Sequence, residues 1–266
     1  MRSRCFPWGL SLAGLLVVHL LTIAKVSAEA RVFLLAGQSN MSGAGLFEQL
    51  KRSEKKPPEG VKIWHENQWQ DIGPGVSANT GRFGPELSFG RAMRKAYPDD
   101  EIYLIKKAAG GTSMHKHWKV IDGKGPLLKS FLKTVEMACK NLDEGKVPYT
   151  ISGMLWMQGE SDADQGKGAE YEGSLKAFIK EMRREFKERK MPFVMGRIIP
   201  TFDKPPGNGP LVRAAQEKVA EDLKYVAWFD TDKFDRINKG HYNHDGQIEL
   251  GEAFAKHMLL LMEEKN

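Results

Sequence analysis

Cysteine is scarce in this sequence. Cys5 and Cys139 are the only two among 266 residues, too few for the disulfide framework that stabilises many small exported domains. The chain also has no CxxC pair and no HExxH motif, so it offers no strong metal-binding signature. Cys139 lies in a helix-like pattern and is expected to be a buried structural residue. We therefore expect neither cysteine-based catalysis nor a metal site.

Long hydrophobic runs are also missing, except near the N-terminus. There a basic start precedes an apolar run, Leu10 to Ile23, and small residues follow up to Ala28. This pattern is typical of a secretory signal peptide. The alternative, a membrane anchor, fits less well because the run is short and contains His19. We expect residues 1–28 to be a signal peptide and residues 29–266 to form a secreted or periplasmic domain without a stable membrane anchor.

A strong excess of charge of one sign is absent. The chain has 40 Lys and Arg against 34 Asp and Glu; the predicted signal peptide holds three of the basic residues and no acid, which leaves 37 against 34. No basic stripe is interleaved with aromatic residues, so a nucleic-acid partner is not expected. Neither repeats nor a domain linker occur. With 41% hydrophobic and 28% charged residues, the composition is typical of one globular domain with a sizeable core.

Short apolar runs alternate with longer amphipathic segments. The apolar runs predict buried strands at Val32–Ala36, Ile102–Ala108, Ile151–Met157, Phe193–Ile198 and Tyr225–Phe229. The amphipathic segments predict helices at Pro85–Tyr97, Pro126–Leu142, Tyr171–Lys190, Leu211–Leu223 and Ile248–Glu263. Strands separated by helices of this length indicate a parallel sheet covered on both faces. We expect an α/β fold, a three-layer α/β/α sandwich with about five parallel strands, whose ligands bind beyond the carboxyl ends of the strands.

Polar residues and glycines follow three of the predicted strands. Ser39 comes directly after the first, where a tight turn would expose its hydroxyl as a nucleophile; a helix N-cap is the alternative role. Gly110 and Gly111 follow the second strand, and glycine lets the backbone approach a ligand closely. Gln158 follows the third, and its side-chain N–H is suited to donate to an oxyanion. These residues are expected to meet at one edge of the sheet.

A histidine lies in a polar loop just before the last predicted helix. His241 is surrounded by glycine and asparagine, which is unlike the environment of a core histidine. It is a candidate base for a serine nucleophile, although a surface histidine accounts for the composition equally well. Glu160 and Asp162, after the third strand, are candidate acids or helix caps, and capping suits Asp162 better.

Four blocks together resemble those of the SGNH-hydrolase superfamily, in particular carbohydrate esterase family 6 and the sialate O-acetylesterase-like group. They are Gly37–Met41 (GQSNM), Gly110–Thr112 (GGT), Gln158–Asp162 (QGESD) and His241 ahead of Gly246. Their order and spacing match over nearly all of residues 29–266. The resemblance implies the flavodoxin-like SGNH hydrolase fold. It also implies a serine esterase that removes O-acetyl groups from carbohydrates through an acyl-serine intermediate, without a cofactor.

The resemblance also implies a role for each site residue. Ser39 is the nucleophile, and His241 is the general base and then the general acid. The oxyanion hole is formed by the N–H of Ser39, the N–H of Gly111 (or Gly110) and the side chain of Gln158.

One position departs from the family pattern. An aspartate usually lies three residues before the catalytic histidine, and Asn238 occupies that position here. An amide oxygen can orient the imidazole but gives less help to an imidazolium than a carboxylate does. Asn238 is our preferred orienting residue; the alternatives are that Asp235 or Glu160 takes over, or that the enzyme is slow.

The substrate is the least determined feature. Trp118 lies near a predicted loop and is a candidate for stacking on a sugar ring, with packing as the alternative. Acetylated xylan, acetylated pectin and O-acetyl sialic acid all fit an acetylated carbohydrate as partner. Two further hypotheses are a lipase or thioesterase of the same superfamily and a non-catalytic carbohydrate-binding protein on the same scaffold.

Overall fold

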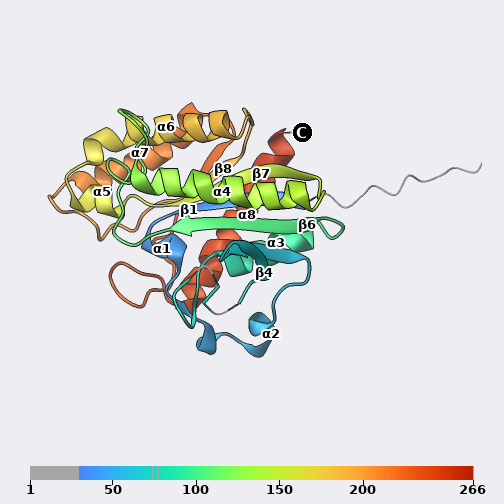
Figure 1. Ribbon diagram of the computed structural model, residues 1–266. Coiled ribbons are helices and arrows are strands. Elements are labelled where there is room, and N and C mark those ends of the chain that lie inside the picture. The colour runs from blue at the N-terminus through green and yellow to red at the C-terminus, as the bar shows by residue number, and fades with distance from the viewer. Residues whose placement is uncertain (1–29, 74, 77, 266) are drawn as a thin grey trace, which may run out of the picture.

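A seven-stranded sheet forms the middle layer of the computed structural model, which describes residues 30–265 except 74 and 77 (Figure 1). Every neighbouring pair is parallel except the edge pair of β4 and β3, which is antiparallel. In spatial order the strands are β4 (Gln68–Asp71), β3 (Val61–His65), β6 (Glu101–Ala108), β1 (Ala30–Gly37), β7 (Tyr149–Met157), β8 (Phe193–Gly196) and β9 (Val226–Phe229).

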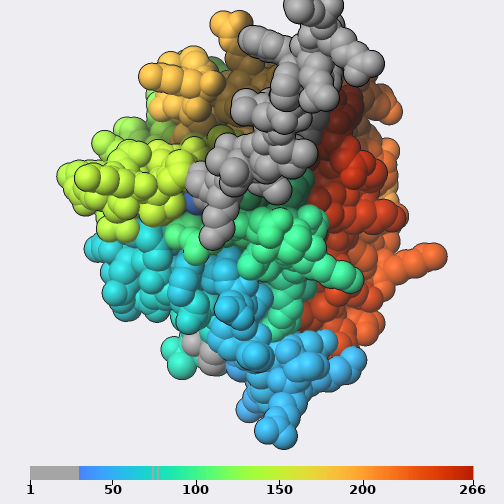
Figure 2. Space-filling model, turned by 90° about the vertical axis from the view of Figure 1, so that its right-hand side faces the viewer, coloured from blue at the N-terminus to red at the C-terminus, as the bar shows by residue number. Residues whose placement is uncertain are grey.

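Helices cover both faces of this sheet, as expected. One face carries α3 (Glu86–Ala96) and α8 (His244–Lys265), which pack against each other. The other carries α4 (Pro126–Glu144), α6 (Gly168–Glu185) and α7 (Asn208–Asp222). Figure 2, which looks toward the amino ends of the central strands, shows α8 (red) and the end of α4 (yellow-green) on opposite sides. The three-layer α/β/α prediction is confirmed.

Short elements complete the chain. The helical turns are α1 (Ser39–Ser42), η1 (Phe47–Gln49), α2 (Arg52–Lys55) and α5 (Glu160–Asp164), and β2 (Gly45–Leu46) pairs with β5 (Arg82–Phe83) in a separate small ladder. None of the helices in the described residues is long and apolar enough to cross a membrane. The predicted signal peptide, residues 1–28, lies outside the described residues.

The five predicted strands are all present, in the spatial order β6-β1-β7-β8-β9. Numbered along the chain, that order is 2-1-3-4-5, the flavodoxin-like arrangement. The hairpin of β3 and β4 was not predicted. Its two turn residues, Glu66 and Asn67, adopt φ values of 49° and 60°, a left-handed geometry that is normally signalled by glycine. Without that glycine the sequence carries no clear hairpin signal.

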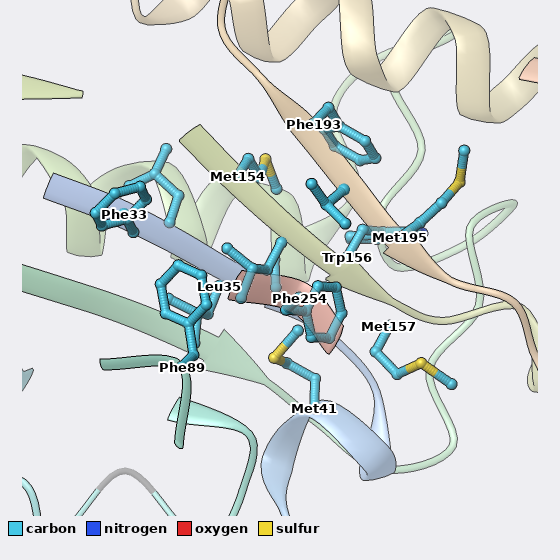
Figure 3. Close-up of a cluster of buried hydrophobic side chains, with 14 of the residues drawn as sticks. Phe33, Leu35, Met41, Phe89, Met154, Trp156, Met157, Phe193, Met195 and Phe254 are labelled. Carbon is cyan, nitrogen blue, oxygen red and sulfur yellow. The ribbon is translucent and has the colours of Figure 1, made fainter. Parts of the chain in front are cut away.

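The core holds the carboxyl ends of the central strands in place. Phe33 of β1 meets Phe89 of α3 edge to face at 5.2 Å on one face of the sheet. Figure 3 shows Met41 of α1 directed into this cluster, and its side chain is fully buried. The turn that follows β1 is therefore fixed to the core. Cys139 of α4 is half-buried rather than buried, and burial raises the pKa of its thiol, which disfavours the reactive thiolate.

Candidate active site

Ser39 is the first residue of α1, directly beyond the end of β1. Gly37 makes this turn: a Cβ there would lie 2.1 Å from the carbonyl oxygen of Met157 on β7, and its φ is 151°. Only glycine allows the two strand ends to approach so closely. Because β1 and β7 flank the point where the strand order reverses, Ser39 lies where ligands bind in open α/β sheets.

Ser39 opens into a cavity of about 490 Å³. The walls come from four segments that are far apart in the sequence but share the carboxyl edge of the sheet. The lining residues are Ser39, Ser42, Gly43, Ala44, Asn79, Arg82, Ala108, Ala109, Gly110, Ile237, Asn238 and His241. The structure therefore brings three predicted catalytic residues, Ser39, Asn238 and His241, to one cavity.

Backbone donors lie beside the Ser39 side chain. As the first residue of a helix, Ser39 has an N–H that no preceding helical carbonyl can accept. Gly110 also lines the cavity, and a Cβ on Gly110 would lie 3.7 Å from the Cβ of Ser39. Gly111, the preferred residue at the sequence level, is not among the lining residues. Gly110 is the better placed of the two glycines named from the sequence, and the choice between their N–H groups stays a prediction.

The imidazole of His241 is held by Asn238. The Oδ1 atom of Asn238 accepts the backbone N–H groups of Gly240 at 2.8 Å and His241 at 3.0 Å, which identifies it as the amide oxygen. His241 Nδ1 lies 3.1 Å from the same oxygen, so Nδ1 must carry the hydrogen. The lone pair is then on Nε2, the nitrogen available as a base. Burial and the positive charge of Arg82 both lower the pKa of His241.

Neither alternative acid reaches this ring. Asp235 is exposed, and Glu160 is almost fully buried. Within the described residues, no hydrogen bond or ion pair joins either carboxylate to His241. Burial raises the pKa of Glu160 to about 7. The residue next to the imidazole is the one preferred at the sequence level, Asn238.

Asn40 connects the Ser39 turn to the His241 loop. Its side-chain N–H donates to the carbonyl oxygen of Gly240 at 3.0 Å, and its Oδ1 accepts the N–H of Tyr242 at 3.3 Å. These are the two residues on either side of His241. Glu160 accepts a further hydrogen bond from the Asn40 side chain at 3.1 Å and so helps to orient that side chain. We call the hydrogen bonds of the fully buried Asn40 side chain to Gly240 and Tyr242 the Asn40 clamp. This clamp was not predicted, although Asn40 is part of the GQSNM block.

Gln158 is not placed as predicted. Its side chain is fully buried and is not part of the cavity wall. Its Nε2 lies within hydrogen-bond distance of three protein oxygens: Gln38 Oε1 at 3.2 Å, Thr112 O at 3.1 Å and Asp162 Oδ2 at 2.6 Å. Two hydrogens facing three acceptors leave none for a ligand. The oxyanion assignment of Gln158 is corrected to a brace between three strand ends.

Trp118 is also a correction. Its side chain is completely buried, and its ring packs edge to face against Trp156 at 5.2 Å and Phe178 at 6.1 Å. It cannot stack on a sugar. Asp162 likewise faces inward and accepts the N–H groups of Met114 at 2.7 Å and His115 at 3.1 Å, which ties down the loop after β6.

The sequence matches the model of a protein family described as carbohydrate esterase, sialic acid-specific acetylesterase, over residues 29–260. A probable carbohydrate esterase of Arabidopsis thaliana is 24% identical over 250 residues, which make up 85% of this chain and 89% of that protein. The X-ray structure of an Arabidopsis thaliana protein has a TM-score of 0.73 to this chain at 22% identity, over 86% of this chain and 98% of that one.

Two further solved structures have the same fold. The protein NanS has a TM-score of 0.66 at 15% identity, over 90% of this chain and 99% of its own. A carbohydrate acetylesterase from Xanthomonas citri has a TM-score of 0.63 at 16% identity, over 88% of this chain and 57% of its own. In both cases the similarity covers about nine-tenths of this chain.

Proposed function

Because the chain belongs to the carbohydrate esterase family of sialic acid-specific acetylesterases, we propose that it hydrolyses O-acetyl esters of carbohydrates through an acyl-Ser39 intermediate. The observation that carries the proposal is the shared cavity of Ser39 and His241, with Asn238 fixing the ring so that Nε2 is the free base. A serine hydroxyl needs such a neighbouring base to act as a nucleophile at neutral pH.

The proposed reaction has two halves. Ser39 Oγ attacks the ester carbonyl carbon and its proton passes to His241 Nε2. The tetrahedral oxyanion accepts hydrogen bonds from the N–H groups of Ser39 and Gly110, each worth about 10²–10³-fold in rate. His241 then protonates the sugar oxygen as the C–O bond breaks. Water attacks the carbonyl carbon of acetyl-Ser39 and gives a proton to His241 Nε2. The bond from that carbon to Ser39 Oγ then breaks, Oγ takes the proton back from His241, and acetate leaves.

The cavity wall favours a small acyl group. Glycine and alanine line the side next to Ser39, and Ile237 is the single large aliphatic residue among the described lining residues. A lipase or thioesterase needs a longer apolar groove for its acyl chain. The polar, open cavity beside Ser39 suits acetyl esters on a hydrophilic alcohol.

The direct test is hydrolysis of p-nitrophenyl acetate by the protein and by its Ser39→Ala variant. We expect activity in the wild type, its loss in the variant, and a steep fall from acetate to longer acyl esters. Absence of activity above the buffer rate in the wild type would favour the non-catalytic carbohydrate-binding alternative. Equal activity on long acyl esters would favour a lipase or thioesterase.

The proposal includes export of the protein. The basic start, apolar run and small residues before Glu29 support a signal peptide that is removed. N-terminal sequencing of the protein from its native source should begin at Glu29; retention of Met1 would contradict export by this route.

A further inference from the structure

Arg82 introduces charge into the active-site cavity. Among the lining residues that the structure describes, it is the only one with a permanent charge, and none is acidic. It reaches the cavity from β5, next to Asn79 and Ala44. A ligand in this cavity therefore meets an unopposed positive charge beside the neutral Ser39 and His241 side chains.

The Arg82 guanidinium is poorly satisfied by the protein itself. One nitrogen, Nη1, donates to the carbonyl oxygen of Ala44 at 2.8 Å, and no ion pair to Arg82 occurs within the described residues. Arg213, which is also partly buried, instead pairs with Asp232 at 2.8 Å. A guanidinium has five N–H donors, and a charge withdrawn from water is costly unless it is paired. The remaining donors of Arg82 are free for a ligand.

We propose that Arg82 is a specificity-determining residue that binds the carboxylate of an O-acetylated acidic sugar while the acetyl group lies at Ser39. The proposal rests on the proposed acetylesterase function and narrows its substrate class. A guanidinium matches the two oxygens of a carboxylate in a planar, bidentate geometry. A neutral acetylated chain such as xylan leaves Arg82 without its counter-charge.

The position of Arg82 links substrate charge to the rate of the reaction. Its charge disfavours the imidazolium of His241, the form that develops as Ser39 is deprotonated. A substrate carboxylate on Arg82 offsets this repulsion, so an acidic sugar should improve kcat as well as KM.

The test separates binding from turnover. Binding of an intact O-acetylated sialic acid is measured by calorimetry in the inactive Ser39→Ala background. The comparison ligand is the same sugar with its carboxylate converted to a primary amide, which has the same shape without the charge. We expect the amide to bind about 10- to 100-fold more weakly, as for loss of a charged hydrogen-bonded pair. Adding Arg82→Gln should weaken the acid by a similar factor and abolish the difference between the two ligands.

The matched control is Arg189→Gln, which changes an exposed arginine in the loop between α6 and β8. This variant should still bind the acid more tightly than the amide. Arg82→Lys should keep part of it, since the charge remains without the planar fork. Equal binding of acid and amide to the Ser39→Ala protein would overturn the proposal. So would a preference that persists after Arg82→Gln.

The two proposals fail in distinguishable ways. If the wild type shows no hydrolysis that depends on Ser39, the esterase function is refuted. The binding comparison of acid and amide would still decide the role of Arg82. A further measurement distinguishes the two kinds of acidic sugar that could supply the carboxylate. It compares turnover by the active protein on acetylated polygalacturonate, on free O-acetylated sialic acid and on acetylated xylan. Under our proposal either acidic substrate is preferred; faster hydrolysis of acetylated xylan than of both would contradict it.

Discussion

Asn238 provides geometry without charge. Its amide oxygen orients the His241 ring at 3.1 Å, but it stabilises an imidazolium less than a carboxylate would. In a serine protease, exchanging the corresponding aspartate for asparagine lowers kcat about 10⁴-fold because the ring is left in the wrong tautomer. Here the amide oxygen faces Nδ1, so the correct tautomer is kept and only the negative charge is missing. The active site therefore has the hydrogen bonds that orient the His241 ring, but it lacks a negative charge beside that ring.

We expect Asn238→Asp to raise kcat by about tenfold or more, because a carboxylate keeps the acceptor for Gly240 and His241 N–H groups and adds a counter-charge. Asn238→Ala should lower kcat, since the ring loses its orienting contact. Steady-state kinetics with p-nitrophenyl acetate measure both. Asp235→Ala is the control and should be silent; if it instead abolishes turnover while Asn238→Ala does not, Asp235 is the orienting residue.

The pH dependence follows from the environment of His241. Burial and Arg82 lower its pKa from the ordinary 6.5, and the base works only when neutral. The acidic limb of the kcat/KM profile should therefore have its midpoint below 6.5. Asn238→Asp should move that midpoint upward, because a nearby carboxylate favours the charged ring. A wild-type midpoint above 7 would show that another group controls the reaction.

At the scale of elements, the site is assembled from the two ends of the domain. Ser39 follows β1, and His241 precedes α8 on the opposite side of the sheet from α4, α6 and α7. Asn40 is the residue that joins these elements, with hydrogen bonds to both neighbours of His241. The position of the His241 loop relative to Ser39 therefore depends in part on this buried side chain.

Asn40→Ala should lower kcat by about 100-fold with little change in KM, because the His241 loop loses its registration against Ser39. Two buried backbone groups lose their partners as well, which should reduce the free energy of unfolding by about 1–3 kcal/mol. Kinetics and urea denaturation measure the two effects separately. Asn141→Ala, at an exposed position of α4, is the matched control. Unchanged kcat in Asn40→Ala would refute the clamp.

Strands, helices and the Ser39 turn were predictable because their signals are local. Buried apolar runs and amphipathic repeats need only a window of the sequence. Gln158 and Trp118 were misassigned because orientation is not local: each follows a plausible strand end or loop, yet each faces inward. Partners that help to turn them inward, such as Gln38 for Gln158 and Phe178 for Trp118, lie at other points of the chain and are brought close only by the fold. Arg82 was missed since no motif surrounds it.

At the scale of the whole molecule, Trp118 belongs to the aromatic core beneath α4 and α6. Trp118→Ala should reduce the free energy of unfolding by about 3–5 kcal/mol, the usual cost of removing a buried aromatic side chain. The KM of the protein that remains folded should change little. Trp118→Phe should recover much of the stability. A large rise in KM without loss of stability would restore Trp118 as a contact of the sugar.

The hydrogen bond between Asn40 and Tyr242 spans 202 positions of the chain. During synthesis Ser39, the proposed nucleophile, therefore leaves the ribosome long before His241, its proposed base. The β1 strand also cannot pair with its neighbour β7 until more than a hundred further residues have been synthesised. Under the proposed mechanism, the growing chain is hydrolytically silent until His241 has been made and its loop has folded against the Ser39 turn.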